Sequence, residues 1–268
     1  MNSLVKVMPN FKKFNDYIFD IKKGVNPIML SGLTDVGKIH MAYSTKFYSE
    51  KPVCIITYNE MQAKRIIKDL AFFGETVRLF PKRDVISFDY VAESKDTLFK
   101  RISVLNQLVK NDKGIIVTTI EAAMQKMITK ESLYKNVMTL KVGDTVDLEV
   151  LKEKLVLLGY ERYDLIEGKG QFSVRGGIVD IATSKNSGVR IEFWGDEIDS
   201  IRKFSLATQR TVNMLDEIEI FPSFEFLLET DVDTVCERIE EKIYPNSVKE
   251  KVKDDIYQIK NGEFLTKI

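Results

Sequence analysis

Residues 32–39 read Gly-Leu-Thr-Asp-Val-Gly-Lys-Ile and have the spacing of a phosphate-binding loop, the turn that joins a buried strand to a helix in nucleotide-binding folds. A working loop ends in Ser or Thr, whose hydroxyl binds Mg²⁺, while the lysine and the backbone N–H groups hold the phosphates. Ile39 has no oxygen to offer a metal, and the charge of Asp35 would repel a triphosphate. The sequence therefore predicts that the turn is retained without binding ATP. The residues that form this degenerate loop are Gly32, Gly37 and Lys38.

Short apolar segments alternate with amphipathic segments over the first 127 residues. Runs of four or five apolar residues predict strands, and apolar residues that recur every three or four positions predict helices. The predicted strands are residues 27–30, 53–57, 77–80 and 114–118, and the predicted helices begin near residues 11, 38, 59 and 98. This alternation is typical of a doubly wound parallel sheet with helices on both faces. We therefore expect an α/β domain over residues 1–127.

The pattern changes from about residue 128 onward. Val189, Ile191 and Phe193 alternate with polar or amphipathic residues, and Gly195 is placed for a turn into the next strand. Such two-faced alternation is typical of antiparallel strands with one solvated side. Residues 128–222 are therefore predicted to form a smaller, inserted α+β domain of mainly antiparallel strands. Residues 223–268 are predicted to be helical and charged, and their abrupt end leads us to expect a fragment of a longer protein.

Composition excludes several classes of site. The chain has 268 residues and no net charge, but residues 1–130 hold 21 of the 40 Lys and Arg and 13 of the 40 Asp and Glu, a balance of +8. Its histidine and two cysteines are His40, Cys54 and Cys236, too few for a zinc site or a histidine-based triad. No apolar run approaches the ~18 residues that span a membrane. We expect a cytoplasmic protein with no metal site and no catalytic residues.

Two polar motifs each allow two interpretations. Residues 196–199, Asp-Glu-Ile-Asp, match the acidic box of helicase-type ATPases, but Gly195 interrupts the strand before them, which favours a solvated hairpin turn. Arg162 and Arg175 can present planar guanidinium groups to an acidic partner, or they can form ordinary surface ion pairs.

Residues 170–181, Gly-Gln-Phe-Ser-Val-Arg-Gly-Gly-Ile-Val-Asp-Ile, are followed by residues 191–202, Ile-Glu-Phe-Trp-Gly-Asp-Glu-Ile-Asp-Ser-Ile-Arg, and then by Thr-Gln-Arg at 208–210. This order of motifs resembles the inserted domain shared by transcription-repair coupling factors (Mfd) and the excinuclease subunit UvrB. The resemblance covers nearly the whole chain, because the preceding doubly wound half and its degenerate loop also fit.

Two departures favour the coupling factors over UvrB. UvrB-like chains carry a loop that ends in Gly-Lys-Thr and a tyrosine-rich hairpin that probes damaged DNA. Here Ile39 replaces the threonine, and the matching stretch, residues 80–91, offers only Phe88 and Tyr90 as candidate probes. The resemblance implies a RecA-like (P-loop-type) domain 1A at residues 1–127, an inserted UvrA-interaction domain at 128–222, and the start of domain 1B at 223–268.

The resemblance also implies a function. The module would recruit UvrA in transcription-coupled nucleotide excision repair, without catalysis or cofactor. Arg162 and Arg175 fall where UvrB-like domains place arginines that contact UvrA, a third family arginine aligns with Ser173, and Phe172 is a candidate apolar contact. In the full-length protein, RNA polymerase and double-stranded DNA would be bound by domains outside this chain.

Two other functions stay open. A fragment of a UvrB-type or helicase-type ATP-dependent DNA repair enzyme would still bind nucleotide at the degenerate loop. Nonspecific DNA binding through the basic first half would weaken steeply with salt. The sequence lacks the interleaving of aromatic and basic residues that single-strand grooves use.

Overall fold

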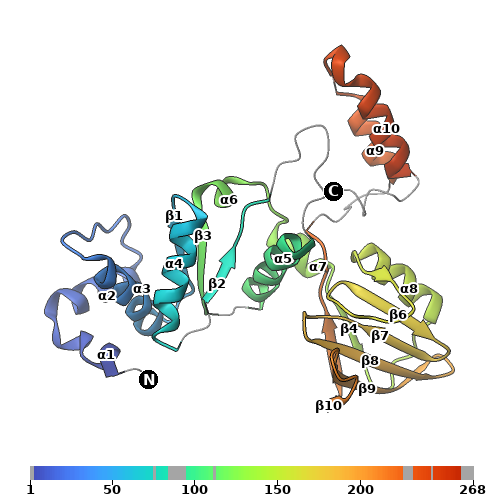
Figure 1. The fold of residues 1–268 in the computed structure, drawn as a ribbon, viewed down its shortest axis with the longest axis horizontal. Coiled ribbons are helices and arrows are strands. Elements are labelled where there is room, and N and C mark those ends of the chain that lie inside the picture. Colours follow the sequence, from blue (N-terminus) through green and yellow to red (C-terminus); the bar gives the residue numbers. More distant parts are fainter. Residues whose placement is uncertain are drawn as a thin grey trace. The chain divides into compact units, whose positions relative to one another are not determined.

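The computed structural model describes residues 3–74, 77–83, 95–110, 113–225, 232–242 and 244–260. The chain divides into two compact units, unit 1 (Met1–Val85 and Ser103–Lys126) and unit 2 (Ile86–Ile102 and Met127–Ile268). Both units combine helices with strands (Figure 1). The domain boundaries predicted at residues 127 and 222 stay predictions. Among the described residues, no helix is long and apolar enough to cross a membrane.

Unit 1 contains short helices and a parallel sheet. Its elements are α1 (Ser3–Lys6), η1 (Met8–Asn10), α2 (Lys12–Lys23), α3 (Asp35–Ser49), β1 (Val53–Thr57), α4 (Glu60–Ala71), β2 (Val77–Phe80), the second part of α5 (Lys95–Val109), β3 (Ile115–Thr119) and α6 (Ile120–Met124). In the described part of this unit the strand order is β1-β3-β2, and both pairings are parallel. The central strand β3 is buried along its whole length, as expected for a parallel strand covered on both faces.

Two apolar clusters cover the two faces of this sheet. Ile115 and Val117 of β3 pack with Tyr43 of α3 and Leu70 of α4 on one side. Ile116, which points the other way, packs with Phe80, Val104 and Ala122. The predicted α/β domain with a parallel sheet is thereby confirmed.

The strand predicted at residues 27–30 is wrong. Residues 25–30 contain no strand, and the side chains of Met29 and Leu30 are 91% and 43% exposed. Pro27 has no backbone N–H to give to a neighbouring strand, and none of the described strands pairs with this run. The apolar run therefore stays outside the sheet.

Unit 2 contains a larger, mainly antiparallel arrangement. Its elements are the first part of α5, α7 (Lys130–Lys135), β4 (Met138–Lys141), α8 (Leu148–Leu157), β5 (Glu161–Arg162), β6 (Gln171–Arg175), β7 (Ile178–Ile181), β8 (Ser187–Trp194), β9 (Glu197–Ser205), β10 (Thr211–Leu215), β11 (Glu217–Ile220), α9 (Val232–Glu240), η2 (Asn246–Val248) and α10 (Lys249–Lys260).

Within residues 113–225, which are described without a gap, the strands of unit 2 form two sheets. Six strands follow the order β10-β9-β8-β7-β6-β5, and β11 pairs with β4. All pairings are antiparallel except β5 with β6. Glycines allow the tight hairpins: Gly176 and Gly195 have positive φ, and a Cβ on Gly177 would lie 2.9 Å from the carbonyl oxygen of Phe193. The antiparallel sheet and the turn at Gly195 predicted from the sequence are confirmed.

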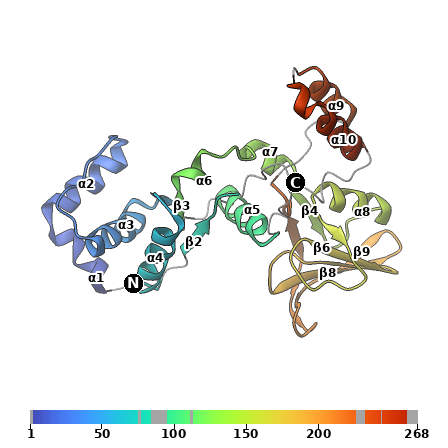
Figure 2. The same ribbon diagram turned by 45° about the horizontal axis from the view of Figure 1, so that its top comes forward.

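The core of unit 2 lies between one face of the six-stranded sheet and α8, which runs along that face (Figures 1 and 2). The helix begins at Leu148 because Asp147 caps it, accepting hydrogen bonds from the backbone N–H groups of Glu149 (2.7 Å) and Val150 (3.2 Å). The buried members of this core are Leu140, Leu151, Leu155, Leu158, Tyr160, Phe172, Val179, Ile181, Val189, Ile191, Ile198, Ile201 and Ile220.

A buried ion pair adds to the packing of unit 2. Arg101 of α5 donates from Nε to Glu225 Oε2 (2.7 Å) and from Nη2 to Glu225 Oε1 (2.9 Å). Both side chains are fully buried. This two-point contact fixes the segment after β11 against α5.

Candidate functional site

The six-stranded sheet has two chemically different faces. Phe172 and Val179 lie on the face that packs on α8. The neighbouring residues along each strand point to the opposite side, which is called here the polar face. The polar face carries Arg175, Asp180, Arg190, Glu192, Trp194 and Arg202, placed by the register of β6 to β9.

One buried carboxylate joins two arginines on the polar face. Asp180 of β7 is 1% exposed and lies between β6 and β8. Arg190 donates to it twice, from Nε to Oδ1 (2.5 Å) and from Nη2 to Oδ2 (2.7 Å), and Arg175 donates from Nη2 to Oδ2 (2.9 Å). Two guanidinium charges against one carboxylate leave this cluster with a surplus positive charge.

The two arginines of the cluster differ in their surroundings. The guanidinium of Arg190 lies 4.9 Å from the ring centroid of Phe204, a cation–π distance. The hydrogen bond to Asp180 raises the pKa of Arg190, so it stays charged. The side chain of Arg175, by contrast, is 51% exposed. Arg175 is therefore the member of the cluster that a partner can reach.

A second ion pair lies beside this cluster. Arg202 of β9 pairs with Glu192 of β8, which also accepts a hydrogen bond from Ser200 Oγ (3.0 Å). These side chains are about a quarter exposed. Because their charges cancel, they add no net charge to the polar face.

Arg162 does not lie on the polar face. It is exposed on the short edge strand β5, and its register partner is Phe172 of the apolar face. Backbone hydrogen bonds from Glu161 N to Gly170 O and from Tyr163 N to Phe172 O, both 2.8 Å, hold β5 at this edge. The structure thus places the two predicted arginines on opposite sides of the sheet rather than on one strand face.

Phe172, predicted as an apolar contact for a partner, is 1% exposed and packs inside the core. It lies on β6, the strand that carries Arg175, and its register partner on β5 is Arg162. A contact between Phe172 and a partner stays a prediction. The exposed aromatic residue of the polar face is Trp194, with 84% of its surface accessible. It is the last residue of β8, at the β8–β9 turn. This turn lies next to the β6–β7 turn, since the N–H of the preceding residue, Phe193, donates to the carbonyl oxygen of Gly177 (2.8 Å).

The degenerate phosphate loop is arranged as a helix cap. Thr34 Oγ1 accepts from the N–H of Gly37 (3.1 Å), and the carbonyl oxygen of Thr34 accepts from the N–H of Lys38 (2.9 Å). Lys38 Nζ lies 3.2 Å from Asp35 Oδ1, and Ile39 is buried in the apolar cluster of unit 1. The N–H groups of Gly37 and Lys38 and the ammonium group of Lys38 therefore have partners within the loop and the first turn of the helix.

This arrangement gives a prediction for nucleotide binding. Millimolar Mg²⁺–ATP is expected to leave the melting temperature unchanged, because Ile39 has no oxygen for Mg²⁺, the N–H groups of Gly37 and Lys38 are already bonded, and Asp35 repels phosphate. A ligand at 100 times its Kd would add about 2.7 kcal/mol. Differential scanning fluorimetry with Mg²⁺ alone as the control measures this. A shift that ATP produces and Lys38→Ala removes would contradict the prediction.

Other candidate sites are weaker. Within the described ranges, no three His, Cys, Asp or Glu residues are grouped as metal ligands would be. The acidic residues of the box at 196–199 are exposed at the β8–β9 turn. Phe88 and Tyr90 lie outside the described residues. Burial lowers the pKa of Lys169 to about 8, but its Nζ donates to the carbonyl oxygen of Phe99 (3.1 Å), which makes it part of the packing.

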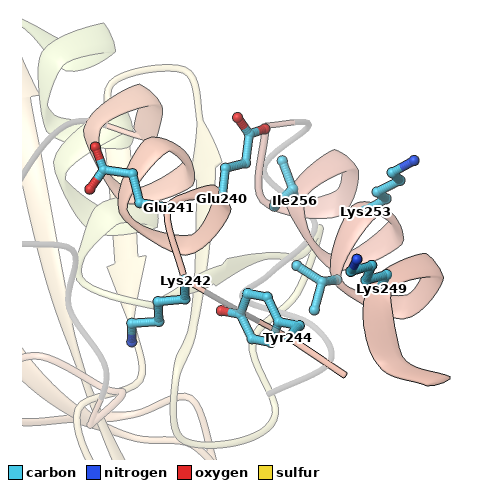
Figure 3. A pocket seen from close by; sticks show the side chains of 8 residues that line it. Glu240, Glu241, Lys242, Tyr244, Lys249, Lys253 and Ile256 are labelled. Carbon is cyan, nitrogen blue, oxygen red and sulfur yellow. The ribbon is translucent and has the colours of Figure 1, made fainter. Parts of the chain in front are cut away.

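A pocket of about 550 Å³ lies between α9 and α10. Figure 3 shows Tyr244 and Ile256 between the two helices, whereas the charged ends of Glu241, Lys242 and Lys253 point outward in different directions. Charged groups of both signs that do not converge favour no particular ligand.

Sequence reasoning missed Asp180 and Arg190 as partners of Arg175. The available signal was the aspartate itself, which interrupts the apolar run of residues 178–181. A carboxylate in a buried strand needs a cationic partner. The pairing could not be assigned without the register of β6, β7 and β8.

The comparisons with known proteins agree with the resemblance noted in the sequence. Residues 138–226 match the family model of the UvrB interaction domain. The chain is 31% identical, over 85% of its length, to the transcription-repair-coupling factor of Bacillus subtilis (strain 168), and 29% identical, over 87%, to that of Staphylococcus aureus (strain MRSA252). Each match covers 20% of the relative, so the chain spans about a fifth of the length of the curated relatives it matches. The predicted resemblance is confirmed: the chain is similar, over most of its length, to the UvrB-like N-terminal region of transcription-repair-coupling factors.

Proposed function

We propose that this chain is a non-catalytic module that docks onto UvrA in transcription-coupled nucleotide excision repair. The observation that carries the proposal is the match of residues 138–226 to the UvrB interaction domain. The half-exposed Arg175 lies inside that match and belongs to a cluster with surplus positive charge. Binding of RNA polymerase and double-stranded DNA is proposed for the longer proteins and not for this chain.

The proposed contact surface combines the polar face with the β5 edge. Arg175 and Trp194 supply an arginine and an exposed aromatic, the residue types that dominate binding energy at interfaces. Arg162 supplies a second positive charge at the edge of the sheet. Phe172 supports this surface from the core. A partner surface rich in carboxylates would complement it.

Unit 1 is proposed to be a RecA-like domain that has lost nucleotide binding. The support is the spacing of the loop at residues 32–39 together with the parallel sheet β1-β3-β2. In this proposal the positive φ of Gly32 allows the chain to turn before the helix. Gly37 and Lys38 belong to the first helical turn of α3.

Alanine at Arg175 is expected to weaken binding of purified UvrA about 30-fold, the effect of a central arginine contact. Arg162→Ala is expected to weaken UvrA binding less. Among the described residues no ion pair restrains the Arg162 side chain, so it loses more rotamer freedom when it binds and contributes less to the affinity. Biolayer interferometry with immobilised chain gives both Kd values. Alanine is the appropriate change, because a glutamate at position 175 would meet Asp180 and destabilise the sheet by like-charge repulsion.

The matched control is Lys141→Ala, which removes an exposed positive charge on β4, outside the six-stranded sheet. Its Kd should equal that of the unmodified chain. Equal Kd values for all the variants would show that the arginines do not form the contact, and an unmodified chain that does not bind UvrA would reject the proposed function.

A further inference from the structure

Arg175 and Arg190 share Asp180 unequally. Arg190 uses Nε and Nη2 in a fork across both carboxylate oxygens, whereas Arg175 gives a single bond from Nη2. An arginine has five N–H donors, so Arg175 keeps most of its donors for other acceptors. The single hydrogen bond to Asp180 therefore leaves Arg175 with N–H donors that can bind a partner.

The burial of the three side chains follows the same division. Asp180 is buried, Arg190 is 19% exposed, and Arg175 is half-exposed. Arg190, stacked on Phe204, neutralises the carboxylate. Asp180 is held in turn by the fork from Arg190, so it offers Arg175 a fixed anchor point.

We propose that Asp180 is a positioning residue that orders the guanidinium of Arg175 before UvrA binds. This inference rests on the proposed function. A free arginine side chain loses rotamer freedom when it is immobilised in an interface, and a side chain already held in its bound orientation loses less. Arg162 provides the contrast within the chain, because no ion pair among the described residues restrains it.

The test is a double-mutant cycle on UvrA affinity. Asp180→Asn is expected to weaken binding about 3- to 10-fold when Arg175 is present, which corresponds to the ordering of one long side chain. In the Arg175→Ala background, the same change is expected to have no further effect, because no side chain remains to be positioned. A merely structural role of Asp180 would weaken binding equally in both backgrounds and would overturn the proposal.

Glu217→Gln is the control, since it breaks an exposed lysine–carboxylate pair on β11, outside the six-stranded sheet, and should leave Kd within about twofold. If the unmodified chain does not bind UvrA, the proposed function and this inference both fail. If Arg175→Ala binds UvrA as the unmodified chain does, the arginine contact and this inference fail, and the docking function stands. If Arg175→Ala weakens binding and the cycle shows no coupling, only this inference fails.

A second measurement needs no change at Asp180. ¹⁵N relaxation of the arginine Nε–H groups, assigned with Arg162→Ala and Arg175→Ala, is expected to show a more ordered side chain at Arg175 than at Arg162. Equal mobility of the two side chains would overturn the positioning role even if Asp180→Asn did not fold.

Discussion

Arg101→Leu is expected to lower the free energy of unfolding of unit 2 by about 3–5 kcal/mol, because it leaves Glu225 charged, buried and without its partner. For a domain of this size the melting temperature should fall by about 10 °C. Urea unfolding followed by far-UV circular dichroism gives the free energy. The double variant Arg101→Leu with Glu225→Leu should recover most of the loss, since it removes both buried charges together.

The control for this prediction is Lys141→Met, which breaks the exposed pair between Lys141 and Glu217. Exposed pairs contribute less than about 1 kcal/mol, so this variant should unfold close to the unmodified chain. Similar losses for the buried and the exposed pair would contradict the assigned role of the Arg101–Glu225 contact.

Phe172→Ala is expected to cost about 3–5 kcal/mol, the effect of removing a fully buried aromatic side chain from a packed core. Any loss of UvrA binding should then follow the loss of folded protein. Binding measured at low temperature, with the folded fraction determined by circular dichroism, separates the two effects. A stably folded Phe172→Ala chain that does not bind UvrA would instead assign Phe172 a direct contact.

Local patterns in the sequence predicted most of the elements correctly. The alternation in residues 189–194 and the glycine at 195 predicted β8, its turn and β9, because side-chain period and turn preference depend on a few neighbouring residues. The helix predicted to begin near residue 38 corresponds to α3, because apolar periodicity also depends on a few neighbouring residues. The strand predicted at residues 27–30 is absent because an apolar run forms a strand only where a neighbouring strand supplies hydrogen bonds.

The arrangement of the candidate site could be predicted from the sequence only in part. Alternation groups Phe172 with Val174, but only the position of α8 decides that this pair faces the core. Arg175, Asp180 and Arg190 meet through the register of three strands, which a one-residue shift would undo. The family resemblance selected Arg162 and Arg175 without giving their orientation on the sheet.

Trp194 offers the most direct test that UvrA docks on the polar face. It is the chain's single tryptophan, so labelling with 5-fluorotryptophan gives one ¹⁹F resonance at the end of that face. Saturating UvrA is expected to shift or broaden this resonance, and at the same concentration Arg175→Ala should leave most of the signal at its free position. A resonance that stays unchanged while the unmodified chain is bound to UvrA would contradict docking on the polar face.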